Sequence, residues 1–302
     1  MIIEKFGNKN KAPVCLALGF FDSLHKGHAA VIKKARAYAR ANNYLTAVFT
    51  FDNNPFSTFG RDIRLVYTFS ERCQILKGMG ADMVVAAEFT PLFMDMTAAD
   101  FLKRLAASCN VKYISCGGDY TFGKNSEGGV KLLKEFCEKN GIALEIVPEI
   151  QAGGVKISST AIRDLIEKGG VETANRCLNA PFCAFGVVAH GRGLGEKLTY
   201  PTANLVPDPE KVVLGQGVYA TNTYIGGKKY TSVTNAGGKP TFRENAYELE
   251  THIISGYNSP LYGQYIKVEF IERIRGIINF STAAELKMQI AKDIEQRITY
   301  NG

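Results

Sequence analysis

Short apolar runs alternate with segments of helical periodicity along the first 180 or so residues of the chain. The apolar runs predict strands at residues 14–20, 45–51, 83–88, 113–116 and 144–147. Apolar positions at helical spacing predict helices at residues 25–42, 70–77, 98–107 and 130–139. Strands that alternate with helices form βαβ units, so we expect an α/β domain whose parallel sheet is covered on both faces. Such sheets bind ligands beyond the carboxyl ends of their strands.

The pattern changes after about residue 181, where β-rich stretches are separated by clusters of Gly, Pro and Asn. These stretches predict strands at residues 182–190, 217–225, 229–235, 247–254 and 265–274. Between two of them, Gly226 and Gly227 are typical of a hairpin turn. Short strands with regular turns favour a closed or nearly closed β-barrel. The length of 302 residues also suits two domains, which we place at residues 1–180 and 181–302.

A helix is predicted at the end of the chain. Ser281 is the candidate N-cap, and Glu285 follows in the first turns. Four apolar residues then recur at every fourth position: Leu286, Ile290, Ile294 and Ile298. We expect this stripe to pack against the barrel rather than to bind a partner.

Composition places the chain among soluble globular proteins, with 46% hydrophobic and 22% charged residues. The net charge of +7 fits a protein that handles anionic ligands, but over 302 residues it is too small to indicate a nucleic-acid or membrane surface. The apolar run at residues 14–21 is far shorter than the ~20 residues of a membrane helix, and no signal segment opens the chain. We therefore expect neither a nucleic-acid nor a membrane partner.

The cysteines indicate a reducing environment. There are 7 of them, scattered without a CxxC pair and without a histidine at zinc-ligand spacing from a pair. A disulfide framework or a structural zinc site is therefore not expected, and buried thiols are the simpler interpretation. We expect the protein to be cytoplasmic.

A predicted strand end and helix start carry the sequence GFFDSLHKGH at residues 19–28. His25 and His28 are spaced i and i+3, which puts them on one face of a helical turn. The free N–H groups and the dipole at a helix start favour an anion, and histidines there can stabilise charge that builds up at phosphorus. Gly27 lets a ligand approach the backbone closely. With only 4 histidines in the chain, this pair favours a phosphate site over two structural or surface histidines.

The sequence KISSTAIR, at residues 156–163, precedes another short helix. Consecutive hydroxyls can cap a helix and donate to a phosphate chain, and Arg163 can clamp anionic oxygens. Alone, this segment is explained equally well by an ordinary helix cap. Combined with the histidine pair, it favours phosphate binding.

Together these motifs resemble those of a known family. HxGH and ISSTAIR resemble the signature pair of the nucleotidyltransferase superfamily, and GDYTFG at residues 118–123 and TFD at residues 50–52 resemble its FAD synthetase branch. YPTAN at residues 200–204 resembles the Pro-Thr-Ala-Asn motif of riboflavin kinases, and the motifs GVYA, NAG, ETH and LYG follow in the order of that family. Over nearly its whole length, the chain is similar to the bacterial bifunctional riboflavin kinase/FMN adenylyltransferases.

The resemblance implies a Rossmann-like nucleotidyltransferase domain that joins FMN to the AMP part of ATP and releases pyrophosphate. It implies that His25, His28 and Arg163 are catalytic. It implies ATP and phosphate binding by Gly19, Phe21, Asp22, Gly27, Ser158, Ser159 and Thr160. Asp119 and Phe122 are implied to line the flavin or adenine pocket.

For the second domain the resemblance implies a riboflavin kinase barrel closed by a helix, which transfers the γ-phosphate of ATP to riboflavin. Glu250 is implied to be the catalytic base, and Asn235 to bind the flavin. Thr202 and Asn204 are implied to hold Mg²⁺, the expected cofactor, with ATP as co-substrate. Gly191, Gly193 and Lys197 are implied to bind ATP. The expected partners are riboflavin, FMN, FAD and ATP, and the expected state is a monomer or weak homo-oligomer.

The chain departs from the family pattern at Ser23 and Thr199, where the family usually has Gly, at Asn54, where His is common, and at Ala236, where Ile is usual. A side chain in place of Gly costs activity where the backbone needs a positive φ. Three alternatives therefore stay open: an enzyme with only one of the activities, a non-catalytic flavin-binding or sensing protein, and a nucleic-acid-binding barrel. The presence of all the catalytic residues argues against the second, and the lack of interleaved aromatic and basic residues argues against the third.

Overall fold

The structure is a computed structural model that describes residues 1–152, 155–189, 202–238, 247–254, 256–257 and 259–299. Its contacts divide the chain into two compact units, Met1–Ser159 and Thr160–Gly302. The two units are described separately.

The first unit contains the parallel sheet that the alternating pattern predicts. The six-stranded sheet has the order β1-β4-β3-β2-β5-β6, and each pair of neighbours is parallel. Its strands are β1 (Ile2–Lys5), β2 (Asn10–Leu18), β3 (Leu45–Phe51), β4 (Met83–Ala87), β5 (Cys109–Gly117) and β6 (Ala143–Val147). The sequence pattern predicted β2 to β6 and missed the edge strand β1, because this strand is short and its residues are mostly exposed. A two-stranded sheet, β7 (Gln151–Ala152) with β8 (Val155–Lys156), follows.

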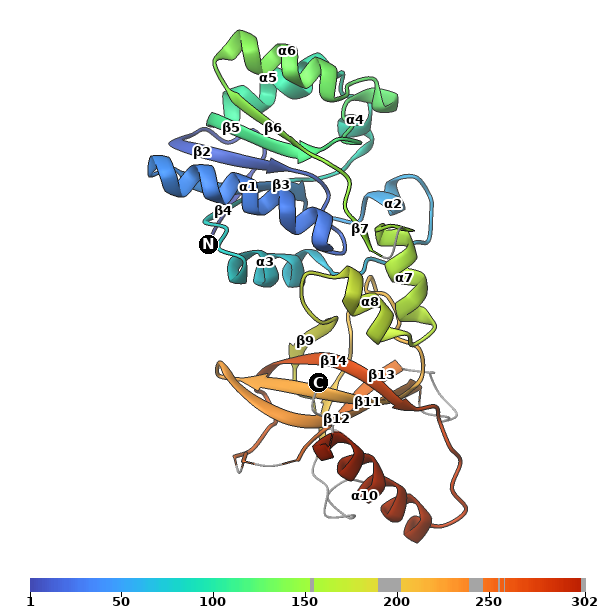
Figure 1. Cartoon of the computed structure of the whole chain (residues 1–302). Coiled ribbons are helices and arrows are strands. Elements are labelled where there is room, and N and C mark those ends of the chain that lie inside the picture. Colours follow the sequence, from blue (N-terminus) through green and yellow to red (C-terminus); the bar gives the residue numbers. More distant parts are fainter. Residues whose placement is uncertain (153–154, 190–201, 239–246, 255, 258, 300–302) are drawn as a thin grey trace. The chain divides into compact units, whose positions relative to one another are not determined.

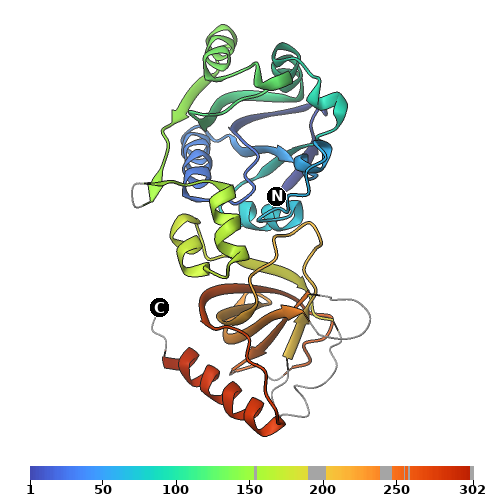
Figure 2. The same ribbon diagram turned by 90° about the vertical axis from the view of Figure 1, so that its right-hand side faces the viewer.

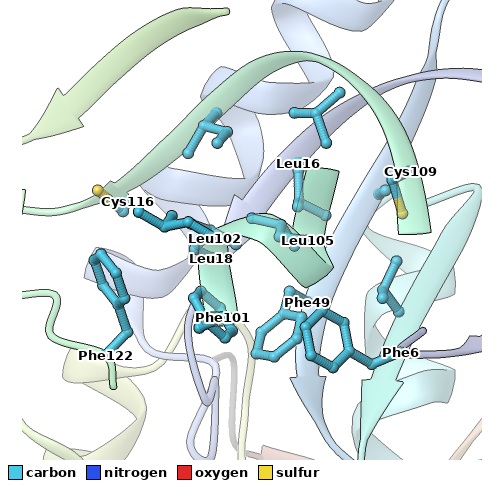
Figure 3. Close-up of a cluster of buried hydrophobic side chains, with 14 of the residues drawn as sticks. Phe6, Leu16, Leu18, Phe49, Phe101, Leu102, Leu105, Cys109, Cys116 and Phe122 are labelled. Carbon is cyan, nitrogen blue, oxygen red and sulfur yellow. The ribbon is translucent and has the colours of Figure 1, made fainter. Parts of the chain in front are cut away.

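Helices cover the parallel sheet on both faces (Figure 1). They are α1 (Lys26–Asn42), α2 (Pro55–Thr58), α3 (Phe69–Gly78), α4 (Pro91–Met94), α5 (Ala98–Ser108) and α6 (Val130–Asn140), with a 3₁₀ turn at Lys124–Ser126. On one face, Leu16 and Leu18 of β2 pack with Phe101 and Leu105 of α5, as Figure 3 shows. On the other face α1 covers β2, β3 and β5. Because successive strand residues point to opposite faces, a continuous apolar run was the correct signal for these strands.

The second unit is built on an antiparallel sheet that curls into a nearly closed barrel, as expected. Its six strands have the order β10-β13-β12-β11-β14-β9. They are β9 (Cys183–Val187), β10 (Thr202–Leu205), β11 (Gly217–Ile225), β12 (Lys228–Gly238), β13 (Tyr247–Ile253) and β14 (Tyr265–Arg275). An antiparallel bridge between Ala189 and Asn204 joins the two edges of the sheet. Gly226 and Gly227 both have positive φ and form the predicted hairpin turn between β11 and β12.

Buried hydroxyl groups are hydrogen-bonded to one another inside this barrel. Thr221 is 2.8 Å from Ser232 and 2.9 Å from Thr234, and the chain of hydroxyls continues to Thr223 and Thr251 at 2.8 and 2.9 Å. Buried hydroxyls need partners, and a slip of one residue would turn them to the other face of the sheet. They therefore fix the register of β11, β12 and β13.

The last helix, α10 (Ala283–Thr299), differs from the sequence prediction in two ways. Thr282, rather than Ser281, supplies the oxygen that accepts the backbone N–H of Glu285, at 3.2 Å. The predicted apolar stripe is only half-buried, and Ile298 at its end is 61% exposed. The buried residues of the helix are instead polar. Figure 2 shows the helix, in red, along the outside of the sheet.

Those polar residues anchor the helix. Asp293 pairs with Arg275 of β14 at 2.8 Å, and Arg297 donates to the side-chain oxygen of Asn222 at 2.8 Å. The expected apolar packing is therefore largely replaced by an ion pair and hydrogen bonds. Periodicity alone could not show this, because Asp293 and Arg297 lie next to the stripe on the same helix.

Two further helices, α7 (Ser159–Glu167) and α8 (Val171–Cys177), precede the barrel. The side chain of Asn175 in α8 donates to the carbonyl of Phe270 at 2.9 Å and accepts the N–H of Phe182 at 2.8 Å. Glu172 accepts the N–H of Arg273 at 2.7 Å. Helix α8 is therefore part of the same compact unit as the barrel. This unit begins at Thr160, whereas the sequence pattern changes only near residue 180.

Candidate active sites

A strained turn connects β2 to α1 in the first unit. Phe21 and Leu24 have left-handed backbones, with φ of 57° and 48°. A non-glycine residue in this region costs roughly 1–3 kcal/mol, and such residues cluster at functional sites. Two side chains of the turn help to hold it: Asp22 accepts the backbone N–H of Val66 at 2.8 Å, and the hydroxyl of Ser23 is 2.9 Å from that of Ser159.

The two histidines of the turn stack on each other. Their ring centroids are 3.6 Å apart and the rings are 14° from parallel. His25 caps helix α1, because its Nδ1 accepts the backbone N–H of His28 at 3.1 Å. A neutral His25 with this acceptor must carry its proton on Nε2. The turn therefore holds both imidazoles in one defined arrangement.

His28 is kept neutral by its surroundings. Burial, the adjacent His25 and the positive charge of Arg72 hold the pKa of His28 well below its ordinary value. Its Nδ1 is buried and has no hydrogen-bond partner among the described residues. A neutral imidazole has one N–H donor and one acceptor, so His28 enters a reaction with a donor available for a phosphate oxygen.

Gly27 is required by the position of His25. A Cβ built on Gly27 would lie 2.9 Å from Cε1 and 3.1 Å from Nδ1 of the His25 ring. Gly19 is similar, since its added Cβ would lie 2.9 Å from the ring of Phe21. At both positions an aromatic ring two residues away occupies the space that a Cβ would need, so each position requires glycine.

A cavity of about 630 Å³ opens beside the histidines. It lies at the carboxyl ends of β2 and β5, which is where the chain order of the sheet reverses and where such folds bind ligands. One part is lined by Gly19, His25 and His28, and the rest is largely aromatic. The aromatic lining consists of Phe49, Phe51, Phe93, Phe101, Tyr120 and Phe122. Such a cavity suits a ligand with an anionic group and a flat, apolar ring system.

The cavity brings together many of the predicted residues of the first unit. Its lining includes Gly19, Phe21, His25, Gly27, His28, Asp119 and Phe122. Asp22 and Ser159 instead hold the turn, through the contacts described above. Ser158 is not among the described residues that line the cavity, and Thr160 and Arg163 belong to the second unit.

Half of the aromatic lining lies outside the motifs found in the sequence, namely Phe49, Phe93 and Phe101. Phe93 and Phe101 come from the segment between β4 and β5, and only the fold places them beside β2 and β3. A phenylalanine in an amphipathic helix such as α5 looks like an ordinary core residue. The TFD and GDYTFG motifs contain the three aromatic lining residues Phe51, Tyr120 and Phe122.

The departures from the family pattern fit the structure without strain at three positions. Ser23 is buried with a negative φ, so it does not need to be glycine. Asn54 caps α2 by accepting the N–H of Phe56 at 3.1 Å, and it also donates to the carbonyl of Ile63 at 2.9 Å. Ala236 is a buried residue of β12. Thr199 lies outside the described residues.

A second group of predicted residues lies side by side on three strands of the barrel. In the strand register, Asn204 of β10 is opposite Glu250 of β13, which is in turn opposite Asn235 of β12. Thr202 is opposite His252 and, two residues from Asn204, lies on the same face of the sheet. The fold thus brings together residues that are up to 48 positions apart in the sequence.

Asn204 is the clearest sign of a ligand in this group. It is 6% exposed, and its Oδ1 is buried without a hydrogen-bond partner among the described residues. A buried amide oxygen normally has a partner, so this atom is suited to a ligand or a metal ion. Gly191, Gly193 and Lys197 lie outside the described residues.

Comparisons with known proteins identify a family for each part of the chain. The FAD synthetase family model matches residues 7–161, and the riboflavin kinase model matches residues 178–300. The bifunctional riboflavin kinase/FMN adenylyltransferase of Bacillus subtilis (strain 168) is 32% identical, over 97% of this chain and 94% of its own length. That of Escherichia coli (strain K12) is 33% identical, over 97% of this chain and 95% of its own.

A solved structure shows the same fold. It is described as a macrolide-efflux protein from Streptococcus pneumoniae, with a TM-score of 0.87, 29% identity and coverage of 100% of both chains. In the present chain, none of the helices that the structure describes is both long and apolar enough to cross a membrane.

Proposed function

The chain belongs to the bifunctional riboflavin kinase/FMN adenylyltransferase family, and we propose that residues 1–180 adenylylate FMN and residues 181–302 phosphorylate riboflavin. The protein makes FAD from riboflavin and uses ATP as co-substrate in both reactions. The division of labour is supported by the two family models, which match separate stretches of the chain, residues 7–161 and 178–300. It is also supported by a phosphate-type site in the first unit and a separate polar group in the barrel.

In the first reaction site, a phosphate oxygen of FMN attacks the α-phosphorus of ATP, and the bond from that phosphorus to the pyrophosphate oxygen breaks. The nucleophile is already anionic, so no base is required. His25 and His28 stabilise the charge that builds up on the α-phosphate, and in many enzymes this kind of stabilisation contributes most of the rate enhancement. The stacked rings and the defined proton on Nε2 of His25 support this role, because donors that are already in place need no reorganisation.

The remaining residues of this site would bind the rest of the substrates. Ser158, Ser159, Thr160 and Arg163 would hold the β- and γ-phosphates, a role that the motif resemblance supports. The aromatic part of the cavity, with Phe122 in its wall, would hold the flavin rings. Burial raises the pKa of Tyr120 in the same wall, so its phenol stays neutral beside an apolar ring. Asp119 would bind a polar edge of the flavin or the adenine.

In the second site, the 5′-hydroxyl of riboflavin attacks the γ-phosphorus of ATP, its proton passes to Glu250, and ADP leaves. An alcohol is a weak nucleophile, so a carboxylate within reach of the hydroxyl contributes to the rate. Glu250 lies between Asn204 and Asn235 in the strand register, which supports its place next to both ATP and riboflavin. Asn235 would bind the flavin.

The residues on β10 fit a magnesium ion. Asn204 Oδ1 is a buried oxygen without a partner among the described residues, and Thr202 on the same face offers a hydroxyl. Mg²⁺ prefers such oxygen ligands and commonly completes its shell with water and substrate phosphates. Thr202 and Asn204 would hold the ion, which when bound neutralises charge on the phosphates of ATP. Gly191, Gly193 and Lys197 would bind ATP.

We also propose the cellular compartment and the oligomeric state in which the protein works. Each of its 7 cysteines is a free thiol, and most are buried, which supports a reducing cytoplasm. We place it there as a monomer or weak homo-oligomer whose partners are small molecules rather than nucleic acid or membrane.

One assay tests the proposed function. The purified chain is incubated with riboflavin, ATP and Mg²⁺, and the flavins are separated by chromatography over time. The proposal expects FMN to appear first and FAD to follow. Formation of FMN alone would mean that the first site does not act, and the absence of any product would favour a flavin-binding protein without catalysis.

A further inference from the structure

A fully buried arginine lies behind the histidine turn. Arg72 of helix α3 is 0% exposed. Its guanidinium donates to the carbonyl of Phe20 at 2.9 Å and, through the other terminal nitrogen, to the carbonyl of Phe51 at 2.8 Å. It also donates to the hydroxyl of Thr50. Phe51 is the last residue of β3 and Phe20 follows the end of β2, so one side chain joins the ends of two neighbouring strands.

The Phe20 carbonyl is held from two directions. Besides the bond from Arg72, it accepts the hydroxyl of Thr50 at 2.6 Å. A carbonyl oxygen has two lone pairs, so these two donors fix its direction. This carbonyl belongs to the peptide bond between Phe20 and Phe21, and Phe21 is one of the two residues of the turn with a left-handed backbone.

The next contacts lead from this peptide to the histidines. The ring of Phe21 packs edge-to-face on His28, with centroids 5.2 Å apart, and His28 stacks on His25. Each contact is between groups with little freedom: a peptide plane, a buried ring and two stacked imidazoles. Loss of the hydrogen bonds from the Arg72 guanidinium would therefore shift the rings of His25 and His28, which are proposed to contact the phosphates.

The charge of Arg72 reaches the site as well. Its guanidinium lies against the rings of Phe20 and Phe69, at 4.9 and 5.7 Å, and not in water. Together with burial and His25, this charge lowers the pKa of His28. The lining of the cavity that His28 shares also includes the acidic residues Asp119 and Glu149. A fixed positive charge behind the turn also favours a polyanion in front of it.

We propose that Arg72 is a positioning residue for adenylyl transfer, whose guanidinium fork holds the turn at residues 19–22 so that His25 and His28 meet the phosphates of ATP in one geometry. The inference rests on the proposed function of the first site. It assigns Arg72 no contact with substrate. Arginine is required because its planar fork can hold two carbonyls at once, whereas the ammonium group of lysine is a compact charge without that geometry.

Three variants test the proposal in the full-length chain. Arg72→Lys keeps the charge and removes the fork, Arg72→Met removes both, and Thr50→Val removes the second donor to Phe20 while keeping the shape. The matched control is Arg104→Lys, because Arg104 also donates to a backbone carbonyl, that of Phe6 at 3.2 Å, and lies 5.0 Å from a phenyl ring. Arg104 is exposed and does not line the 630 Å³ cavity.

The rates of FAD formation from supplied FMN and of FMN formation from riboflavin are measured for each chain. We expect Arg72→Lys to lower kcat for adenylylation roughly 10- to 100-fold, the size of effect that a small misplacement of catalytic groups produces. KM for ATP should change less. Riboflavin phosphorylation should stay at the wild-type rate, and a wild-type circular dichroism spectrum and unfolding temperature show that the first unit of the variant is folded. Thr50→Val should act in the same direction but less strongly, and Arg104→Lys should change neither rate.

The pKa of His28 gives a readout that a merely structural role would not move. With only 4 histidines in the chain, labelled-histidine NMR can follow His28 through a pH titration. The pKa should rise in Arg72→Met, because one of the charges that lowers it is gone, and change little in Arg72→Lys, which keeps the charge.

The proposal is overturned if folded Arg72→Lys and Thr50→Val both adenylylate FMN at the wild-type kcat. It is also overturned if only KM for ATP changes, or if the His28 pKa is the same in Arg72→Met as in the wild type. Should Arg72→Lys fail to fold, Thr50→Val decides the question alone. The failure of the proposed function is a different result: His28→Ala would then still make FAD from FMN.

Discussion

Replacing Gly27 with alanine should lower the adenylylation rate strongly while changing the free energy of unfolding little. Gly27 is the second residue of helix α1, just after the N-cap His25. The added Cβ would lie 2.9 Å from Cε1 of the His25 ring, closer than atoms approach without moving. The ring is stacked at 3.6 Å on His28 and accepts its N–H at 3.1 Å, so it cannot give way without disturbing both contacts.

The effects on stability largely cancel. Alanine is favoured over glycine inside a helix by about 0.8–1 kcal/mol. Weakening an N-cap costs about 0.5–2 kcal/mol. The net change in the free energy of unfolding for Gly27→Ala is therefore about 1 kcal/mol or less, which corresponds to a Tm shift of roughly 2–4 °C in a domain of this size.

The effect on activity is not compensated. A displaced His25 no longer presents its Nε2–H to the α-phosphate in the arrangement that the stack provides. A misplacement of about 1 Å at a reacting centre can cost roughly 100-fold in rate. Gly27→Ala should thus lower FAD formation from FMN by about that factor and leave riboflavin phosphorylation unchanged.

The assay measures single-turnover FAD formation with saturating FMN and MgATP, together with thermal unfolding. Gly78→Ala is the matched control, since Gly78 ends helix α3 and its added Cβ would meet no heavy atom within 4 Å. We expect this control to keep full activity. If Gly27→Ala forms FAD at the wild-type rate, the geometry of the His25–His28 pair does not limit the reaction, and the prediction is wrong.

Three other changes have defined outcomes. Glu250→Gln should lower single-turnover FMN formation by roughly 10²–10⁴-fold and leave adenylylation of supplied FMN intact; an unchanged rate removes Glu250 as the base. Asn204→Ala should raise the Mg²⁺ concentration that half-saturates the kinase reaction by roughly tenfold or more, measured as rate against free Mg²⁺; an unchanged value would place the ion elsewhere. The fragment Thr160–Gly302 should unfold at a higher temperature than residues 181–302 while both make FMN, because the shorter piece loses α8 and its partly buried hydrogen bonds to the barrel, each worth about 1 kcal/mol. Equal Tm values for the two fragments would show that α8 does not support the barrel.

The sequence pattern predicted most elements of both units, because each depends on local signals. Apolar runs identified five strands of the parallel sheet, and two adjacent glycines identified the β11–β12 hairpin. What it missed depends on contacts between distant residues. The edge strand β1 has only two apolar residues, Ile2 and Ile3, and both are exposed. The anchoring of α10 depends on the partners of Asp293 and Arg297 in the barrel.

The same distinction holds for the sites. The histidine pair could be found from the sequence because its chemistry is contained in one turn. The line of Asn204, Glu250 and Asn235 came from a family resemblance, and the strand register now gives it a physical basis. Arg72 carried no signal at all, since a single arginine in an amphipathic helix is typical of a solvent-exposed face. Only its burial behind the turn shows what it holds.

We propose that one chain holds two separate sites and that the FMN made at one site is the substrate of the other. A complementation experiment tests this proposal. The wild type, His28→Ala, Glu250→Gln and an equal mixture of the two variants are each incubated with riboflavin, ATP and Mg²⁺, and FMN and FAD are separated by chromatography. We expect His28→Ala to accumulate FMN without FAD, and Glu250→Gln to make little of either. The mixture should make FAD, because FMN released by one variant is adenylylated by the other. A mixture that makes no FAD, or His28→Ala that loses FMN formation although it is folded, would contradict two separate sites.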